Sequence, residues 1–253
     1  MIYALLIFTT AYTIFVLFII SGLFRHNVLP VSHSKNLPFV SVVIAARNEE
    51  NNLPELLDDL INQEYPLNKF EIIIVNDRSS DSTPEILKNA SDNYAFIKTI
   101  NINKKSKIMT PKKNAVNEGI KSSKGEIILA TDADCRMGPL WVASMAYSLM
   151  NKNGIIIGYS EISDIKKSYF EKYQKLDFLA ILIANAGASG WNQYWSGTGQ
   201  NLAYYKNDYF EIGGFHPVKS KISGDDMYLV QSISNIKRGY THIDPNSFVK
   251  TKA

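Results

Sequence analysis

Short aliphatic runs alternate with amphipathic stretches along this 253-residue chain between residues 39 and 132. The runs are rich in Val and Ile, which is typical of strands that are buried on both faces. We predict four strands, at residues 39–46, 70–75, 96–102 and 127–132.

The stretches between these runs carry helical signals. Residues 53–61 repeat leucines at spacings of three and four, which forms one apolar stripe along a helix. Ser82 and Glu85 have the spacing of a capping box, with Pro84 in the first turn, and another helix is expected around 115–120. Because strands and helices alternate with short connections, we predict an α/β fold with a central, mostly parallel sheet flanked by helices.

Polar side chains follow three of the predicted strands. Arg47 and Glu49 follow the first, Asp77 the second, and Asp132 and Asp134 the fourth. The carboxyl ends of parallel strands share one edge of a sheet, where α/β proteins bind ligands, so we expect these residues to converge there. Two neighbouring carboxylates repel each other unless a cation lies between them, and a divalent ion that also binds phosphate oxygens suits this pair.

Simpler interpretations of the same residues stay open. Asp132 and Asp134 can begin a loop and cap the helix near 139–141, and Lys112 and Lys113 can form a solvated helix start. The sequence contains neither the glycine-rich dinucleotide motif after its first strand nor a P-loop motif. A phosphate-bearing ligand would therefore need a metal and basic side chains such as this lysine pair.

The amino-terminal segment predicts a membrane anchor. Residues 1–24 carry no charged side chain and, at about 1.5 Å per residue, can span a hydrocarbon core of about 30 Å. No basic residue precedes the apolar run, which argues against a signal peptide. Arg25, His26 and Lys35 follow it, so the positive-inside rule predicts that the following domain is cytoplasmic, after a linker at 25–38.

Composition excludes some classes of function. A net charge of +3, without a basic stripe interleaved with aromatic residues, argues against nucleic acid as a partner. The single cysteine, Cys135, excludes an internal disulfide and fits a reducing compartment. We expect it to be a small buried thiol, and we expect His242 to be structural rather than a metal ligand.

Two further segments allow two interpretations each. Residues 169–184 predict a helix whose apolar end, 176–183, is too short to span a membrane. We expect it to be core with partial membrane contact, although it can also lie at the membrane interface. Asp225 and Asp226 suit catalysis, but acids also suit an ordinary helix start.

Six motifs follow one another along the chain. They are Val-Val-Ile-Ala-Ala-Arg-Asn-Glu-Glu at 42–50, Ile-Val-Asn-Asp-Arg-Ser-Ser-Asp-Ser-Thr at 74–83, Lys-Lys-Asn-Ala-Val-Asn at 112–117, Ala-Thr-Asp-Ala-Asp at 130–134, Gly-Thr-Gly-Gln-Asn at 197–201 and Gly-Asp-Asp-Met-Tyr-Leu at 224–229. In order and spacing, this set resembles the family 2 glycosyltransferases with a GT-A fold. The resemblance is strongest to membrane-bound members such as bacterial cellulose and poly-N-acetylglucosamine synthases, and it extends from residue 39 to the end.

The resemblance implies roles on the donor side. Asp77 would contact the nucleobase, expected to be uracil, with Glu49 near the same nucleoside. Asp132 would face the ribose and the metal, and Asp134 would bind Mg²⁺ or Mn²⁺ on the diphosphate. The remaining positions expected to bind the nucleotide-sugar are Ala45, Arg47 and Lys112.

The resemblance also implies an acceptor side. Asp226 would be the catalytic base, next to Asp225. The turn at 196–199, including Gly197, Thr198 and Gly199, would line the acceptor site, and Trp191 or Trp195 would stack on a sugar.

Together these expectations describe an inverting transferase that moves a sugar from a UDP-sugar to a hydroxyl of a polysaccharide or lipid. The alternatives are a membrane-anchored sugar-nucleotide-binding assembly subunit without turnover, and a phosphotransferase that forms an aspartyl phosphate. The latter would carry its acid pair after the first strand rather than the fourth. A Gln-x-x-Arg-Trp motif and further transmembrane helices are missing, so the chain is expected to be either a fragment of a longer protein or a shorter enzyme that lacks a processive acceptor channel. Because the sequence ends just after a strand-like segment, we expect an anchor at 1–24 and a GT-A domain at 39–253 that is truncated at its carboxyl end.

Overall fold

The computed structural model describes residues 1–27, 36–163 and 168–251, so most of the predicted linker, Lys35 included, lies outside the described residues. Its centre is a seven-stranded sheet in the order β3-β2-β1-β4-β8-β6-β9. The strands are β1 (Val40–Ala46), β2 (Phe70–Asp77), β3 (Ile97–Ile102), β4 (Ile127–Ala130), β6 (Ile155–Gly158), β8 (Leu202–Tyr205) and β9 (Gly239–His242). Only β8 is antiparallel to its two neighbours in this sheet, so the predicted mostly parallel sheet is confirmed.

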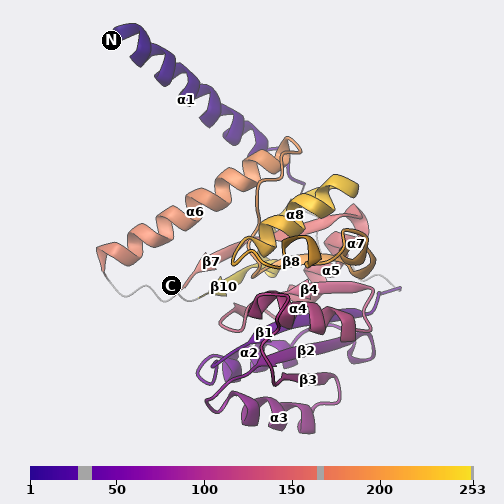
Figure 1. The fold of residues 1–253 in the computed structure, drawn as a ribbon. Coiled ribbons are helices and arrows are strands. Elements are labelled where there is room, and N and C mark those ends of the chain that lie inside the picture. Colours follow the sequence, from indigo (N-terminus) through magenta and orange to yellow (C-terminus); the bar gives the residue numbers. More distant parts are fainter. Residues whose placement is uncertain (28–35, 164–167, 252–253) are drawn as a thin grey trace.

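Helices cover both faces of this sheet (Figure 1). One face packs against α2 (Leu53–Ile61), α3 (Thr83–Asn93) and α5 (Trp141–Lys152). The other packs against α4 (Pro111–Ser122), α7 (Lys206–Glu211) and α8 (Asp225–Ile236). Side chains alternate between the two cores, as Val42 and Val43 of β1 show. Burial of each such aliphatic side chain contributes about 1.5–3 kcal/mol.

A small second sheet lies beside the first. It consists of β5 (Arg136–Met137), β10 (Val249–Thr251) and β7 (Ser160–Ile162), with β10 in the middle. Arg136 fixes this sheet to α2, because its guanidinium donates to both carboxylate oxygens of Asp59, at 2.6 and 2.8 Å. This sheet brings the end of the described chain next to the segment that follows β4.

Two long helices, α1 (Ile2–Leu23) and α6 (Tyr169–Gly190), project from this body and meet at their carboxyl ends (Figure 1). Glycines bring the two backbones together: a Cβ added to Gly22 would lie 1.9 Å from the carbonyl oxygen of Gly187. In the part of the chain that the structure describes, α1 is the one helix long and apolar enough to cross a membrane, and nearly all its side chains are exposed. The expectation that the apolar part of α6 is mainly core is wrong, because Leu176 and Ile181 are more than half exposed.

Local details differ from the sequence prediction at two helix starts. The Ser82–Glu85 capping box does not form; instead the backbone N–H of Thr83 donates to the Asp81 carboxylate, at 3.0 Å. The acids after β4 do not cap α5 either. That helix begins at Trp141, and the backbone N–H of Val142 donates to the side chain of Gln63, at 2.9 Å.

Candidate active site

A cavity of about 340 Å³ opens at the carboxyl ends of β1, β2 and β4. It lies where an α/β sheet is expected to bind its ligand. Every residue predicted for the donor side lines this one cavity: Ala45, Arg47, Glu49, Asp77, Lys112, Asp132 and Asp134. We call it the donor cavity, after that prediction. The structure therefore brings together residues that lie up to 89 positions apart in the sequence, from Ala45 to Asp134.

Two loops that form the rim are fixed to each other. Asn48 and Arg78 follow β1 and β2 and both adopt a left-handed backbone, with φ of 57° and 58°. The backbone N–H of Ser80 donates to the side-chain oxygen of Asn48 at 2.9 Å, and the backbone N–H of Glu49 donates to the Thr83 hydroxyl at 2.8 Å. Left-handed backbone at non-glycine residues persists only where the surroundings hold it, and it is concentrated at binding sites.

Asp77 lies at the end of β2, on the wall of the cavity, and is nearly buried. The guanidinium of Arg78 donates two hydrogen bonds, of 2.8 and 2.9 Å, to the carboxylate of Asp77. This planar, bidentate arrangement fixes the orientation of the carboxylate. A carboxylate with two oxygens retains further acceptor capacity for a ligand N–H.

Lys112 lies between the acids predicted for the donor side and those predicted for the acceptor side. It stands in the first turn of α4, and its ammonium lies 2.7 Å from the carboxylate of Asp132. Burial acts to lower the pKa of Lys112, but its ion pair and hydrogen bond with Asp132 outweigh this effect, so the pKa is raised. The negative charges of Asp225 and Asp226 act in the same direction. The side chain of Lys112 is half exposed, so the simpler interpretation of a solvated lysine pair is wrong only for Lys113, which is buried and donates to the carbonyl of Lys221 at 2.7 Å.

The carboxylate of Asp134 is hydrogen-bonded to a residue of the second sheet. The hydroxyl of Thr251 in β10 donates to its carboxylate at 3.2 Å, and the amide of Gln200 donates to the same Thr251 hydroxyl at 3.2 Å. Cys135 next to it is fully buried, as predicted, and burial raises the pKa of its thiol to about 12. Cys135 does not line the cavity that Asp132 and Asp134 line.

Within residues 1–27, 36–163 and 168–251, no group of three or more His, Cys, Asp and Glu side chains gathers as a metal cage. The donor cavity does contain the Asp132 and Asp134 carboxylates. Mg²⁺ is commonly bound by one or two carboxylates together with phosphates of the substrate, so this pair fits a metal that arrives with a diphosphate. His242 lies apart from this cavity, buried and hydrogen-bonded to Ser144 at 2.8 Å.

Asp226 stands in the first turn of α8, so the helix-start interpretation of this acid is correct. Its carboxylate accepts from the backbone N–H of Gly199, at 3.2 Å, and from that of Met227, at 2.8 Å. A Cβ added to Gly199 would lie 3.7 Å from Asp226 and 4.0 Å from the ammonium of Lys112. Three segments thus meet here: the starts of α4 and α8 and the turn at 196–199.

Burial raises the pKa of Asp226, and the charge of Asp225 raises it further. The two backbone N–H donors and Lys112 act against this shift without cancelling it. Asp226 therefore holds a proton at a higher pH than an ordinary aspartate, which makes it a stronger base.

The remaining residues predicted for the acceptor side have different neighbours. Asp225 lies 3.9 Å from the ammonium of Lys113, and the hydroxyl of Thr198 lies 3.1 Å from that of Ser160. Gly197 lines a separate apolar cavity.

The two tryptophans pack against α1. Trp191 stacks on Phe18 at 6.0 Å between ring centroids, and the guanidinium of Arg25 lies 4.1 Å from its ring, so a sugar that stacked on Trp191 would have to displace these contacts. Trp195 stacks on Phe15 at 6.3 Å between ring centroids. Its place on the acceptor side stays a prediction.

Sequence reasoning missed several residues that shape the site. Thr251 and Gln200 support Asp134, and their positions depend on pairing between strands that are far apart in sequence. Asp81 and Thr83 were within reach of prediction, because they follow β2 in the same polar loop as Asp77.

The sequence model of the glycosyl transferase family 2 matches residues 41–225. The chain belongs to this family. The match includes every predicted donor-side residue and stops one position before Asp226, whose assignment therefore depends on the geometry and on the motif.

Known proteins agree with this assignment. The chain is 30% identical over 230 residues to the probable glycosyltransferase YdaM of Bacillus subtilis, which covers 87% of this chain and 54% of that protein. It is 30% identical over 173 residues to the poly-β-1,6-N-acetyl-D-glucosamine synthase of Staphylococcus epidermidis, covering 67% of this chain and 40% of the synthase. The chain thus spans about half the length of the first of these relatives, and less of the second.

Among solved structures, a mannosyltransferase from Pyrobaculum calidifontis superimposes with a TM-score of 0.73 at 20% identity. The superposition covers 98% of this chain and 67% of the other. The likeness shows the fold, and the predicted GT-A fold is confirmed.

Proposed function

We propose that the chain is the catalytic part of a membrane-anchored inverting glycosyltransferase. It would transfer a sugar from a nucleotide-diphosphate donor, a UDP-sugar, to a hydroxyl of a polysaccharide or lipid acceptor. One observation supports the proposal: the ammonium of Lys112 lies 2.7 Å from Asp132 of the donor cavity and also feels the charge of Asp226, so these acids would act in one site.

The donor cavity supports binding of the nucleotide. Asp77, oriented by Arg78, would accept from the N–H of the nucleobase, and Glu49 would lie near the same nucleoside. Lys112 would shift from Asp132 towards the diphosphate as that anion arrives. An exchange of one anionic partner for another retains the charge of the ammonium and adds affinity for phosphate.

Asp132 and Asp134 would hold Mg²⁺ or Mn²⁺, which, when bound, neutralises the charge that grows on the diphosphate leaving group. The solved Pyrobaculum mannosyltransferase is a complex with GDP-Man and Mn²⁺, which supports a divalent ion in this fold. Thr251 would keep the Asp134 carboxylate oriented for that ion.

Asp226 would take the proton from the acceptor hydroxyl as that oxygen attacks C1 of the sugar. The N–H groups of Gly199 and Met227 fix its carboxylate, and its raised pKa makes it a stronger base. Base and leaving-group site belong to different segments, as in-line displacement requires, and a single displacement inverts the anomeric centre. The turn at 196–199, with Asp225 and Trp195, would border the acceptor.

The anchor and the domain boundaries belong to this proposal as well. α1 would cross the membrane, with Arg25 and His26 on the cytoplasmic side, and residues 39–253 would form the GT-A domain at that face. The exposed apolar side chains of α6, such as Phe170 and Leu176, would contact the membrane surface.

The test is sugar transfer, or hydrolysis of UDP-sugars, by the full chain reconstituted in lipid nanodiscs. Asp226→Asn should lower the rate by about 10²–10⁴-fold, because the base is lost while the size of the side chain is kept. Asp92→Asn, at an exposed position in α3, is the matched control and should leave the rate unchanged.

Equal rates for Asp226→Asn and the wild type would exclude Asp226 as the base. Binding of UDP without any turnover by the wild type would favour the alternative of an assembly subunit that binds sugar nucleotides.

A further inference from the structure

A second polar pocket, of about 220 Å³, lies where α1 ends. We call it the basic pocket, because Arg25, His26, Lys152 and Arg238 line it and no carboxylate does. Arg25 and His26 directly follow α1, Lys152 is the last residue of α5, and Arg238 directly precedes β9. None of them belongs to the donor cavity or to the surroundings of Asp226.

The cations of this pocket lack a negative partner. Arg25, Lys152 and Arg238 form no ion pair with any residue that the structure describes. Lys152 and Arg238 instead share one aromatic ring, since the charged group of each lies 5.4 Å from the ring centroid of Tyr240. A cation without an anionic partner attracts an anion that enters the pocket.

Neutral contacts hold the remaining members of the pocket in place. The guanidinium of Arg25 donates to the carbonyl of Gly190, at 2.9 Å, and lies over the ring of Trp191. His26 contacts the carbonyl of Ala186 through its Nε2, at 2.7 Å. Arg25 and His26 are therefore positioned before any ligand arrives, which reduces the entropic cost of binding.

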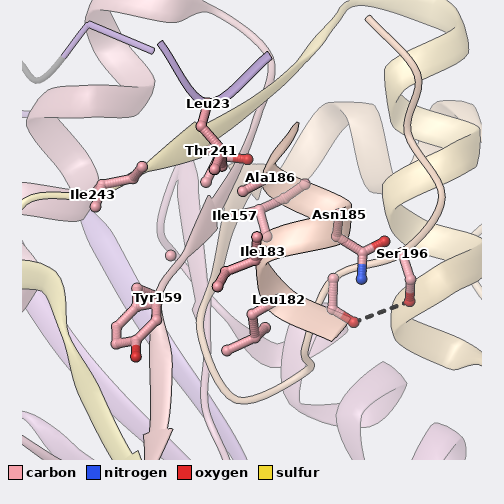
Figure 2. A pocket seen from close by; sticks show the side chains of 12 residues that line it. Leu23, Ile157, Tyr159, Leu182, Ile183, Asn185, Ala186, Ser196, Thr241 and Ile243 are labelled. Atoms are coloured by element: carbon pink, nitrogen blue, oxygen red, sulfur yellow. Dashed lines mark hydrogen bonds between the residues drawn. The ribbon is translucent and has the colours of Figure 1, made fainter. Parts of the chain in front are cut away.

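An apolar cavity of about 160 Å³, drawn in Figure 2, shares the lining residue Thr241 with the basic pocket. Its wall is made by Leu23 at the end of α1, Leu182 and Ile183 of α6, and Ile157 of β6. Thr241 lines both hollows, and Ala186, whose carbonyl contacts His26, lines the apolar one. A dry apolar cavity of about 150 Å³ accommodates benzene, so this one has room for roughly six carbons of a hydrocarbon chain.

The position of the basic pocket and the apolar cavity relative to α1 indicates which kind of ligand fits them. Both contact the last residues of α1 or those directly after it, where a membrane-crossing helix leaves the hydrocarbon layer. Basic pockets at this level of a membrane protein bind anionic lipid headgroups. Free phosphate or a nucleotide would fill the basic pocket alone, whereas a phospholipid supplies both an anion and a chain.

We infer that the basic pocket and the adjoining apolar cavity form a binding site for an anionic phospholipid, with its phosphate among Arg25, Lys152 and Arg238 and part of one acyl chain beside Leu23 and Leu182. The inference requires α1 to be a membrane anchor but does not require sugar transfer. The bound lipid would fix the angle between α1 and the catalytic body.

The experiment is native mass spectrometry of the full chain released from detergent micelles, titrated with phosphatidylglycerol or phosphatidylcholine of identical acyl chains. The wild type should retain phosphatidylglycerol at least about tenfold more tightly, and Lys152→Gln/Arg238→Gln should abolish most of that preference. Lys69→Gln/Lys88→Gln removes the same charge from exposed positions far from α1 along the chain and should change nothing. Circular dichroism of both double variants checks that they fold.

Three outcomes would overturn the inference. They are equal retention of the two lipids by the wild type, an equal loss of preference in both double variants, and displacement of the lipid by glycerol 3-phosphate at matched concentration. The last outcome would assign the site to a free phosphate compound. Asp226→Asn should bind phosphatidylglycerol as the wild type does, so failure of the proposed enzymatic function would leave this test intact.

Discussion

The sheet half of the molecule, around β1, β2 and β4, and the helical half, around α1 and α6, are stabilised in different ways. In the sheet half, side chains alternate between two closed cores, and the predicted donor-side acids follow from where the strands end. In the helical half, α1 and α6 meet through glycine backbones, and many apolar side chains face outwards. The position of the predicted donor site therefore follows from topology, whereas the position of α1 depends on a few close contacts. The predictions below test this difference.

The largest effect is expected in the closed core. Leu60→Ala in α2 removes a fully buried side chain and should lower the free energy of unfolding by about 2–5 kcal/mol. Leu176→Ala in α6 removes the same atoms from an exposed position and should change it by less than about 0.5 kcal/mol. Chemical denaturation of the full chain in detergent, followed by circular dichroism, measures both. Equal costs would mean that α6 is as much a part of the core as α2.

A smaller effect is expected where α1 meets α6. Gly187→Leu would place a Cβ 2.4 Å from the carbonyl oxygen of Ile19, so the helices must separate, at a cost of about 1–3 kcal/mol. The emission of Trp191, which stacks on Phe18, should shift as that contact loosens. Affinity for UDP should stay unchanged. If the affinity for UDP fell together with the shift in Trp191 emission, the contact between α1 and α6 would be coupled to the nucleotide site.

The mildest change concerns the pH dependence of transfer. Asp226 must be deprotonated to act as a base, so kcat/KM should fall as the pH drops through its raised pKa. The charge of Asp225 contributes to that raised pKa, so Asp225→Asn should move the acidic limb of the profile to lower pH. A limb that stays in place, or moves to higher pH, would show that another group governs it.

Much of the sheet half could be predicted from the sequence. The first three predicted strands match β1, β2 and β3 to within two residues, and the acids after β2 and β4 line the predicted crevice. Alternation of buried side chains and the shared edge of a parallel sheet were sufficient for this result. The fourth strand ends at Ala130 rather than Asp132, because the chain turns towards the second sheet.

The remaining features depend on contacts that leave little local signal. Thr251 supports Asp134 only because β10 lies between β5 and β7. Trp191 carries the aromatic surface expected of a sugar platform, yet it stacks on Phe18 of α1, which lies 173 positions earlier in the sequence. The α6 helix was predicted with its correct start, but its exposure depends on what lies beside it in three dimensions.

The central claim is that acids from separate strand ends bind a nucleoside diphosphate together with a divalent ion. Isothermal titration calorimetry of the full chain with UDP and with GDP, each with and without Mn²⁺, tests it most directly. UDP should bind well only when Mn²⁺ is present, GDP should bind more weakly, and Asp134→Asn should remove the dependence on Mn²⁺. A preference for GDP, or equal binding of UDP with and without the metal, would contradict the account.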